Sequence, residues 1–167
     1  FTGILHHKEG MDLLPSNLSL SAFEMSLVTA MSRETVLRTY LSEVKQAYDY
    51  IIIDCMPSLG MVTLNVLSAA DSVIIPVQAQ YLPAKGMAQL LKTVGKVKRC
   101  INPELMVDGI LLTLVDSRTN LARSTISALK KSFGGSIKIY QTMIPTGIKA
   151  AEVSSKGMSI YEYDPDS

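Results

Sequence analysis

The sequence predicts an α/β fold: a mostly parallel sheet with helices on both faces. Short runs of β-branched and other apolar residues recur along the chain, each too short for a typical helix. Longer stretches lie between them, in which apolar residues return every three or four positions, as in amphipathic helices. Apolar strands that alternate with such helices are typical of parallel sheets whose strands are buried on both faces.

The first part of the chain predicts two helices. Ser21 and Glu24 fit a capping box for a helix over about 22–31, in which each side chain satisfies a free backbone N–H group. Ser32 is expected to cap a second helix over 33–47, whose apolar residues form one stripe.

Four apolar runs predict strands, and helices fill the intervals. We expect strands at 50–54, 72–77, 109–115 and 137–144. We expect helices at 61–70, around 87–101 and at 121–133, the last closed by Gly134-Gly135 in a left-handed cap. The first two strands, YIIID and SVIIPV, are continuous enough to be buried on both faces.

The ends of three predicted strands mark a candidate site. Ligands of open parallel sheets bind beyond the carboxyl ends of the strands. Asp54, Asp116 and Pro145 each stand at such an end. The sequence therefore predicts several site loops along one edge of the sheet.

Length and composition suit one well-packed domain. The 167 residues are 47% hydrophobic, which is enough for a substantial core. No apolar run approaches the ~20 residues of a membrane span, and the opening FTGILHHKEG lacks the layout of a secretory signal. Cys55 and Cys100 have no metal-type spacing. Together these features predict a cytoplasmic protein with reduced thiols and no membrane partner.

The net charge of +1 conceals an asymmetry. Up to residue 84 the chain has four basic and eight acidic residues, whereas from Lys85 onward it has twelve basic and seven acidic ones. Such a distribution favours a polyanionic partner, although a solvated lysine face is the commoner explanation.

Asp54 carries the main chemical hypothesis. P-loop NTPases place the Walker B aspartate, which holds Mg²⁺ often through water, at the end of an apolar strand. Here YIIID is followed by a turn with Pro57, Ser58 and Gly60, which supplies a loop able to respond to a γ-phosphate. By itself the pattern also fits a sheet edge that merely ends in an aspartate.

Several segments in order resemble the ParA/Soj family of partitioning ATPases, relatives of MinD with a deviant Walker A motif. The stretch YDYIIIDCMPSLGMVTLNVLSAADSVIIPVQAQY is similar to the central part of that family. The segments GILLTLVDSRTNLAR, MIPTGIKAAEVSSKG and YEYDPDS follow in the family's order, so the likeness covers nearly the whole chain. The resemblance implies a P-loop NTPase-like fold.

The resemblance also implies roles for individual residues. Asp54 would be the Walker B aspartate, linked to Mg²⁺, and Pro57, Ser58 and Gly60 would form switch II. An adenine pocket would be lined by Thr113, Asp116, Arg118 and Pro145. Lys149 stands where the family commonly has an arginine near its DNA-binding surface. Independently of the resemblance, Lys149 belongs to the basic half of the chain together with Arg123, Lys130, Lys131 and Lys156, and these residues could contact DNA phosphates. An ordinary solvated face remains open for them. ATP and Mg²⁺ would be the family's cofactors, and DNA and a ParB-like protein its partners. The family would act as a homodimer or higher oligomer, associated with the nucleoid.

The chain departs from the family pattern in several places. Met56 replaces a proline, and Thr146-Gly147 replaces an Arg-Asn pair after Pro145. The largest departure is the Gly-rich phosphate loop ending in Lys-Ser/Thr, which does not occur in the sequence. Residues 1–167 are therefore expected to be one partial ParA-type domain, the C-terminal two-thirds, without the first strands. Without backbone amides and a lysine around the phosphates, we expect this chain alone to bind no ATP and to be inactive.

Two other functions stay open at this point. The first is a non-enzymatic DNA-binding or adaptor module that keeps the basic face. The second is a MinD-like positioning ATPase, which would need an amphipathic helix beyond YDPDS. SRTNL and IKAAEVSSKG resemble ParA more closely than MinD.

Overall fold

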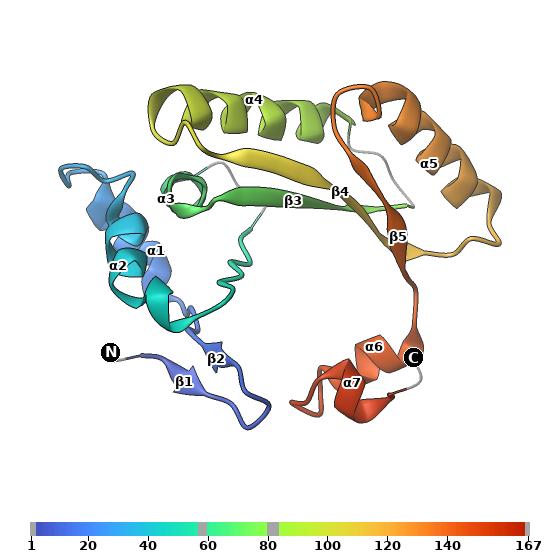
Figure 1. Ribbon diagram of the computed structural model, residues 1–167, viewed down its shortest axis with the longest axis horizontal. Helices are drawn as coiled ribbons and strands as arrows, with labels where there is room; N and C mark the ends of the chain where they lie inside the picture. The colour runs from blue at the N-terminus through green and yellow to red at the C-terminus, as the bar shows by residue number, and fades with distance from the viewer. Residues whose placement is uncertain (1–2, 57–59, 80–83, 166–167) are drawn as a thin grey trace. The chain divides into compact units, whose positions relative to one another are not determined.

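The computed structural model describes residues 3–56, 60–79 and 84–165, which form two compact units (Figure 1). Unit 1 comprises Phe1–Ala70 with Arg99–Pro103. Unit 2 comprises Asp71–Lys98 with Glu104–Ser167.

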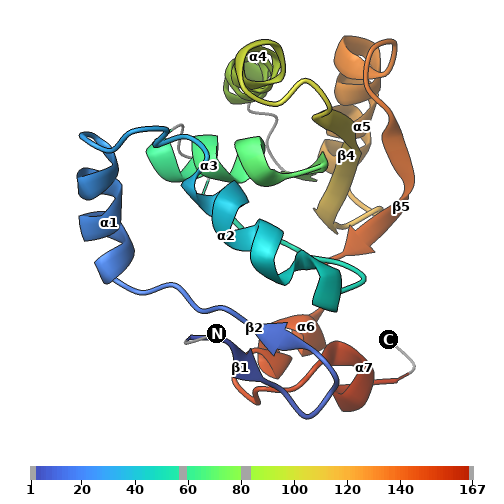
Figure 2. The same ribbon diagram turned by 60° about the vertical axis from the view of Figure 1, so that its left-hand side comes forward.

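Unit 2 contains a parallel three-stranded sheet in the order β3-β4-β5. The strands are β3 (Ser72–Gln78), β4 (Met106–Val115) and β5 (Ile139–Pro145). Helix α4 (Ala84–Cys100) connects β3 to β4, and α5 (Asn120–Phe133) connects β4 to β5. Both helices lie on the same side of the sheet in Figures 1 and 2. The predicted α/β class with a parallel sheet is confirmed.

The core of unit 2 lies between this sheet and its two helices. Its most buried members are Ile75, Val77, Met87, Ile110 and Leu129. Along β3, Ile75 and Val77 are buried while Ile74 and Pro76 are exposed. The expectation that β3 is buried on both faces is wrong, because alternate side chains of a strand point to opposite faces and only one set meets α4 and α5.

Unit 1 is mainly helical. Its elements are a short antiparallel hairpin of β1 (Leu5–His6) and β2 (Asp12–Leu13), then α1 (Ser19–Leu27), α2 (Val36–Val44), the 3₁₀ turn η1 (Lys45–Ala47) and α3 (Met61–Ala69). Helices α2 and α3 pack on each other. Its buried apolar residues include Leu27, Val44, Val66 and Leu67.

The isoleucine run at 50–54 is not a strand, contrary to the sequence prediction. Residues 49–56 have no helical or strand hydrogen-bonding pattern, and the Ile52 side chain is 92% exposed. A strand needs a neighbour whose backbone groups complete its ladder. Among the described residues no segment pairs with this run, so its β-branched composition does not produce a strand or bury it.

Two predicted helix N-caps are also wrong. Helix α1 begins at Ser19 without a side-chain cap, and Glu24 reaches Met61 instead of forming a capping box with Ser21. Helix α2 follows Thr35, whose hydroxyl donates to the Ser32 carbonyl, so the Ser32 side chain is not its cap.

Helix α5 does end before Gly134 as predicted, but Gly134 has φ −62° and so is not left-handed. Hydrogen bonds from Gly134 N–H to Lys130 C=O and from Ser136 N–H to Phe133 C=O close the helix instead.

The chain after β5 forms two short helices, α6 (Ile148–Val153) and α7 (Ile160–Tyr163), which contact each other. No helix within the described ranges combines the length and the apolar content needed to cross a membrane.

Candidate functional site

Asp54 ends the exposed isoleucine run in unit 1. Its side chain is exposed and lines a cavity of about 900 Å³. Apolar side chains from α2 and α3, among them Leu41 and Val66, form much of the wall, and the carboxylates of Asp12 and Glu24 also face it. Among the described residues, no hydrogen bond or ion pair engages the Asp54 carboxylate.

The start of α3 is held by a contact that sequence reasoning missed. Pro57 and Ser58 lie outside the described residues, whereas Gly60 immediately precedes α3. Glu24 Oε1 accepts a hydrogen bond of 2.8 Å from the Met61 N–H, in the first turn of α3. A Cβ atom at Gly60 would overlap this carboxylate oxygen. Glycine at this position therefore lets a carboxylate approach the positive end of the helix.

Helix α3 is fixed to α2 by buried polar side chains. Asn65 is only 3% exposed. Its Oδ1 accepts from the Leu37 N–H at 3.1 Å, and its Nδ2 donates to Arg33 C=O at 2.7 Å and to Met61 C=O at 3.0 Å. The Arg38 guanidinium donates to Ser68 C=O. These bonds satisfy groups that would be costly to bury alone, and they fix α3 against α2.

The second group of candidate residues lies at the carboxyl edge of the sheet in unit 2. Thr113 pairs with Gln78, and Val115 pairs with Pro145. The N–H of Thr146 also donates to Val115 C=O at 3.2 Å. The prediction that the strand ends meet at one edge is therefore confirmed for Asp116 and Pro145. The adenine-pocket role of these residues stays a prediction.

Asp116 forms a bidentate ion pair with Arg118. The guanidinium donates from Nε to Oδ1 at 2.9 Å and from Nη2 to Oδ2 at 3.0 Å, and the Arg118 N–H adds a bond of 3.1 Å. These hydrogen bonds hold the pKa of the Asp116 carboxyl below its ordinary value. Thr119 follows and caps α5 by accepting from the Ala122 N–H. The loop after β4 is thus ordered by its own polar residues.

The backbone of Leu114, the residue before the last one of β4, is strained. Its φ is 50°, a left-handed conformation that is rare for a bulky residue. The register of the β4–β5 pair shifts between Leu112 and Val115 at this point. Strained residues of this kind are frequent near functional loops, and Leu114 lies two residues before Asp116.

The predicted DNA-binding residues differ in how far their charge is already compensated. Lys149 Nζ lies 2.8 Å from Asp164 Oδ1, which raises the pKa of the lysine by hydrogen bonding. Arg123 Nε donates to Ser117 C=O at 3.2 Å. Lys130, Lys131 and Lys156 are exposed. The structure places Lys130 and Lys131 next to each other in the last turn of α5, while their role in DNA binding stays a prediction.

Unit 1 contains a hydrogen-bonded group of Asp12, Tyr48 and His6 that the sequence did not predict. Asp12 accepts from the Tyr48 hydroxyl at 2.6 Å through Oδ2 and lies 2.6 Å from His6 Nδ1 through Oδ1. The Tyr48 and His6 hydrogen bonds lower the pKa of the Asp12 carboxyl. The group ties the β1–β2 hairpin to the chain after η1, across 36 positions of sequence.

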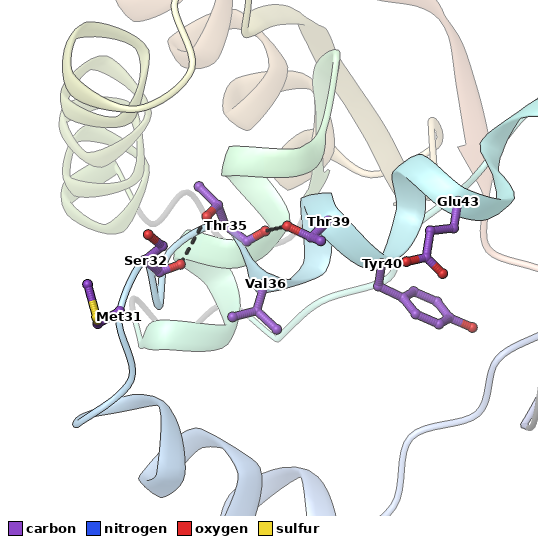
Figure 3. Close-up of a pocket in the computed structure, with 7 residues that line it drawn as sticks. All are labelled: Met31, Ser32, Thr35, Val36, Thr39, Tyr40 and Glu43. Carbon is purple, nitrogen blue, oxygen red and sulfur yellow. Dashed lines mark hydrogen bonds between the residues drawn. The ribbon is translucent and has the colours of Figure 1, made fainter.

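A smaller hollow of about 380 Å³ lies along α2 (Figure 3). Its threonines are directed to the backbone: Thr35 Oγ1 donates to Ser32 C=O and Thr39 Oγ1 to Thr35 C=O. The hollow thus offers mainly apolar surface beside Tyr40 and Glu43.

The described residues offer no site in which protein side chains alone would hold a metal ion. Within the described ranges, no three His, Cys, Asp or Glu residues are grouped for a metal ion. A cation at Asp54 would therefore need most of its oxygen ligands from water or phosphate, which is how Mg²⁺ is commonly held.

A parallel α/β sheet with aspartates at the ends of apolar runs is the architecture of nucleotide-binding α/β proteins. Comparison with known families agrees with this class, because the AAA domain family matches residues 3–107, more than half of the chain. The chain belongs to this family, and it is similar to relatives that carry the names Soj and ParA.

Two curated relatives and one solved structure illustrate the likeness. The chain is 47% identical over 159 residues to the sporulation initiation inhibitor protein Soj of Bacillus subtilis, covering 95% of this chain and 62% of that protein. It is 41% identical over 151 residues to the chromosome-partitioning ATPase Soj of Treponema pallidum, covering 90% of this chain and 59% of that protein.

The solved structure is cobyrinic acid a,c-diamide synthase from Mycobacterium smegmatis with bound ADP and magnesium. It has a TM-score of 0.82 and 36% identity, covering 87% of this chain and 58% of that one. In all three comparisons the chain spans about three-fifths of the other protein's length.

Proposed function

We propose that this chain is the C-terminal two-thirds of a ParA-type ATPase that acts in plasmid or chromosome partitioning. The proposal rests above all on the 47% identity to Soj across 95% of the chain. The unmatched share of that relative leaves room for a first strand and a phosphate loop. Such a strand would pair with the isoleucine run at 50–54, whose exposed side chains and adjoining cavity have no cover among the described residues.

In the longer protein Asp54 would hold Mg²⁺, in part through water, as the Walker B aspartate. The exposed, uncommitted carboxylate fits this role, because the cation needs a hard oxygen ligand at a fixed position. When bound, Mg²⁺–ATP would supply the phosphoryl group that is hydrolysed. Thr113, Asp116, Arg118 and Pro145 would border the adenine, and Pro57, Ser58 and Gly60 would form the switch II turn.

The chain alone is proposed to lack hydrolysis. Its sequence contains no Gly-rich loop ending in Lys-Ser/Thr, and the first N–H of α3 is already bonded to Glu24. This amide at the start of α3 is therefore not free to bind phosphate. In the longer protein, ATP would drive dimerisation and non-specific DNA binding, and a ParB-like partner would stimulate hydrolysis.

The test compares the purified 167-residue chain with the protein encoded by the complete gene. We expect no Mg²⁺-dependent ATP hydrolysis above the blank for the chain alone. We expect hydrolysis for the complete protein, abolished by Asp54→Ala and retained by Cys55→Ala, an adjacent control. Robust turnover by the 167-residue chain, lost in Asp54→Ala, would contradict the proposed incompleteness. A complete protein that binds DNA without any effect of nucleotide would favour the adaptor module.

A further inference from the structure

The first turn of α3 is capped by a side chain from another helix. Gly60, the residue before α3, offers no side chain that could accept a hydrogen bond from the helix start. The acceptor is instead Oε1 of Glu24 on α1, which lies 2.8 Å from the Met61 nitrogen. Helices α1 and α3 contact each other, and Glu24 is half-buried although most of α1 is exposed. The cap therefore comes from a carboxylate 37 positions earlier in the sequence.

The glycine at position 60 is required by this carboxylate and not by its own backbone. Gly60 has φ −77° and ψ −176°, an extended conformation that any residue adopts. A Cβ atom at this position would overlap Glu24 Oε1, so that the carboxylate could not keep its bond to Met61. Helix starts are usually capped by a serine, threonine, aspartate or asparagine at the position that Gly60 holds here. The glycine thus serves a contact between two helices in place of a local cap.

The position of α3 as a whole does not depend on Glu24. The buried Asn65 side chain joins the middle of α3 to α2. The Arg38 guanidinium donates to Ser68 C=O in the last turn of α3. Glu24 adds its bond at the first turn, where the chain enters the helix. Its effect is therefore expected on the chain that leads into α3 more than on the packing of the helix.

The chain that leads into α3 comes directly from Asp54. Five residues separate Asp54 from Gly60, and Asp54 and Glu24 line the same cavity in unit 1. A connection this short passes a shift of the helix start on to the chain that follows the aspartate. Groups that take part in a reaction must be held within about 0.5 Å of their productive positions. A contact at the start of α3 can therefore influence chemistry at Asp54 without touching a substrate.

We propose that Glu24 is a positioning residue for ATP hydrolysis in the complete protein, because its bond to the Met61 N–H fixes the chain that follows Asp54. The inference rests on the proposed function and adds a residue of α1 to the site. Glu24 acts through Met61 and not through the nucleotide, so it should affect kcat and leave KM for ATP nearly unchanged. The bond needs an acceptor oxygen at this reach, which the side-chain amide of glutamine also supplies.

The first experiment follows the Met61 amide of the 167-residue chain by hydrogen exchange. An amide in the first turn of a helix has no acceptor within that helix. Its exchange should be slow in the wild type and in Glu24→Gln, and about tenfold faster in Glu24→Ala and Gly60→Ala, which lose the bond. Gly95→Ala is the matched control, because a Cβ atom at Gly95 meets no atom within 4 Å. An unprotected Met61 amide in the wild type would overturn the inference, since the contact would not persist in solution.

The second experiment measures steady-state ATP hydrolysis by the complete protein. Glu24→Ala should lower kcat on the order of tenfold to a hundredfold, because a misplacement of about 1 Å has effects of this size. KM for ATP should stay within about twofold of the wild type, since only the positioning of reacting groups changes. Glu24→Gln should retain most of kcat. Glu43→Ala, which removes an exposed carboxylate of α2, is the control and should behave like the wild type.

A double variant separates the contact from other roles of Gly60. Gly60→Ala should lower kcat about as much as Glu24→Ala, and the double variant should lose no more than either single variant, because all three lack the same bond. A double variant that loses the product of the two single losses would contradict the inference.

The remaining outcomes distinguish the inference from the proposed function. If Glu24→Ala keeps the wild-type kcat, or raises KM alone, the inference is wrong while the proposed function stands. The inference is also wrong if Glu24→Gln loses as much as Glu24→Ala, or if the loss of kcat only follows a loss of folded protein seen by circular dichroism. If the complete wild-type protein hydrolyses no ATP, the inference and the proposed function fail together.

Discussion

Two stretches of this chain look alike in sequence and differ in structure. YIIID (50–54) and GILLTLVD (109–116) are both apolar runs that end in an aspartate. The second forms the middle strand of a sheet, with Ile110 fully buried and Asp116 held by Arg118. The first has no strand partner among the described residues, and Ile52 and Asp54 are exposed. Strand composition therefore becomes a strand only where a neighbour completes the ladder.

The largest expected effect is on stability, when one isoleucine in each of the two runs is shortened to alanine. Ile110→Ala should lower the free energy of unfolding by about 3 kcal/mol, because Ile110 is fully buried and the substitution leaves a cavity. Ile52→Ala, the matched control, should change it by less than ~0.5 kcal/mol, because Ile52 is already in contact with solvent. Urea unfolding of both variants measures the difference. Equal destabilisation would mean that the isoleucine run is buried.

The next effect tests how the chain after the unpaired run is held. Asn65→Ala should lower the stability of unit 1 by about 2 kcal/mol, because the partly buried Leu37 N–H and Arg33 carbonyl lose their hydrogen-bond partner. Asn120→Ala, at an exposed position of α5, is the control and should be nearly neutral. Amide hydrogen exchange in α2 and α3 reports the change, and wild-type exchange rates in Asn65→Ala would rule out this anchoring role.

The smallest effect concerns the aspartate at the end of the paired run. Arg118 lowers the pKa of Asp116, so the stability gained from this pair is present above the ordinary carboxyl pKa and is lost as pH falls through the lowered value. In Arg118→Gln, the pKa of the Asp116 carboxyl, followed by NMR titration, should rise to its ordinary range. Arg123→Gln, which removes a nearby guanidinium that does not contact Asp116 in the structure, should leave the midpoint in place. An unchanged pKa of Asp116 in Arg118→Gln would show that this ion pair does not persist in solution.

The elements that the sequence predicted well have their partners within the chain. Strands β3, β4 and β5 and helices α4 and α5 follow from the alternation of apolar runs and helical stripes, and each connection joins neighbouring strands. The meeting of Asp116 and Pro145 at one edge followed from parallel pairing alone. The run at 50–54 was predicted wrongly because the deciding factor, a neighbouring strand, is not encoded in the run itself.

The site contacts that sequence reasoning missed join distant residues through single hydrogen bonds. Glu24 and Met61 are 37 positions apart, and Asp12 and Tyr48 are 36 apart. Neither pair belongs to a periodic pattern, so no local signal identifies it. The sequence instead predicted a capping box for Glu24, because a glutamate three residues after a serine is a local signal for a helix start.

Amide hydrogen exchange of the 167-residue chain tests most directly whether the Asp54 segment lacks its neighbouring strand. The amides of residues 51–53 should exchange at rates close to those of an open chain, because no ladder protects them. The amides of Ile75 and Ile110, in strands of similar composition, should be strongly protected. Protection at 51–53 equal to that in β3 and β4 would contradict the account, since the run would then be paired in solution.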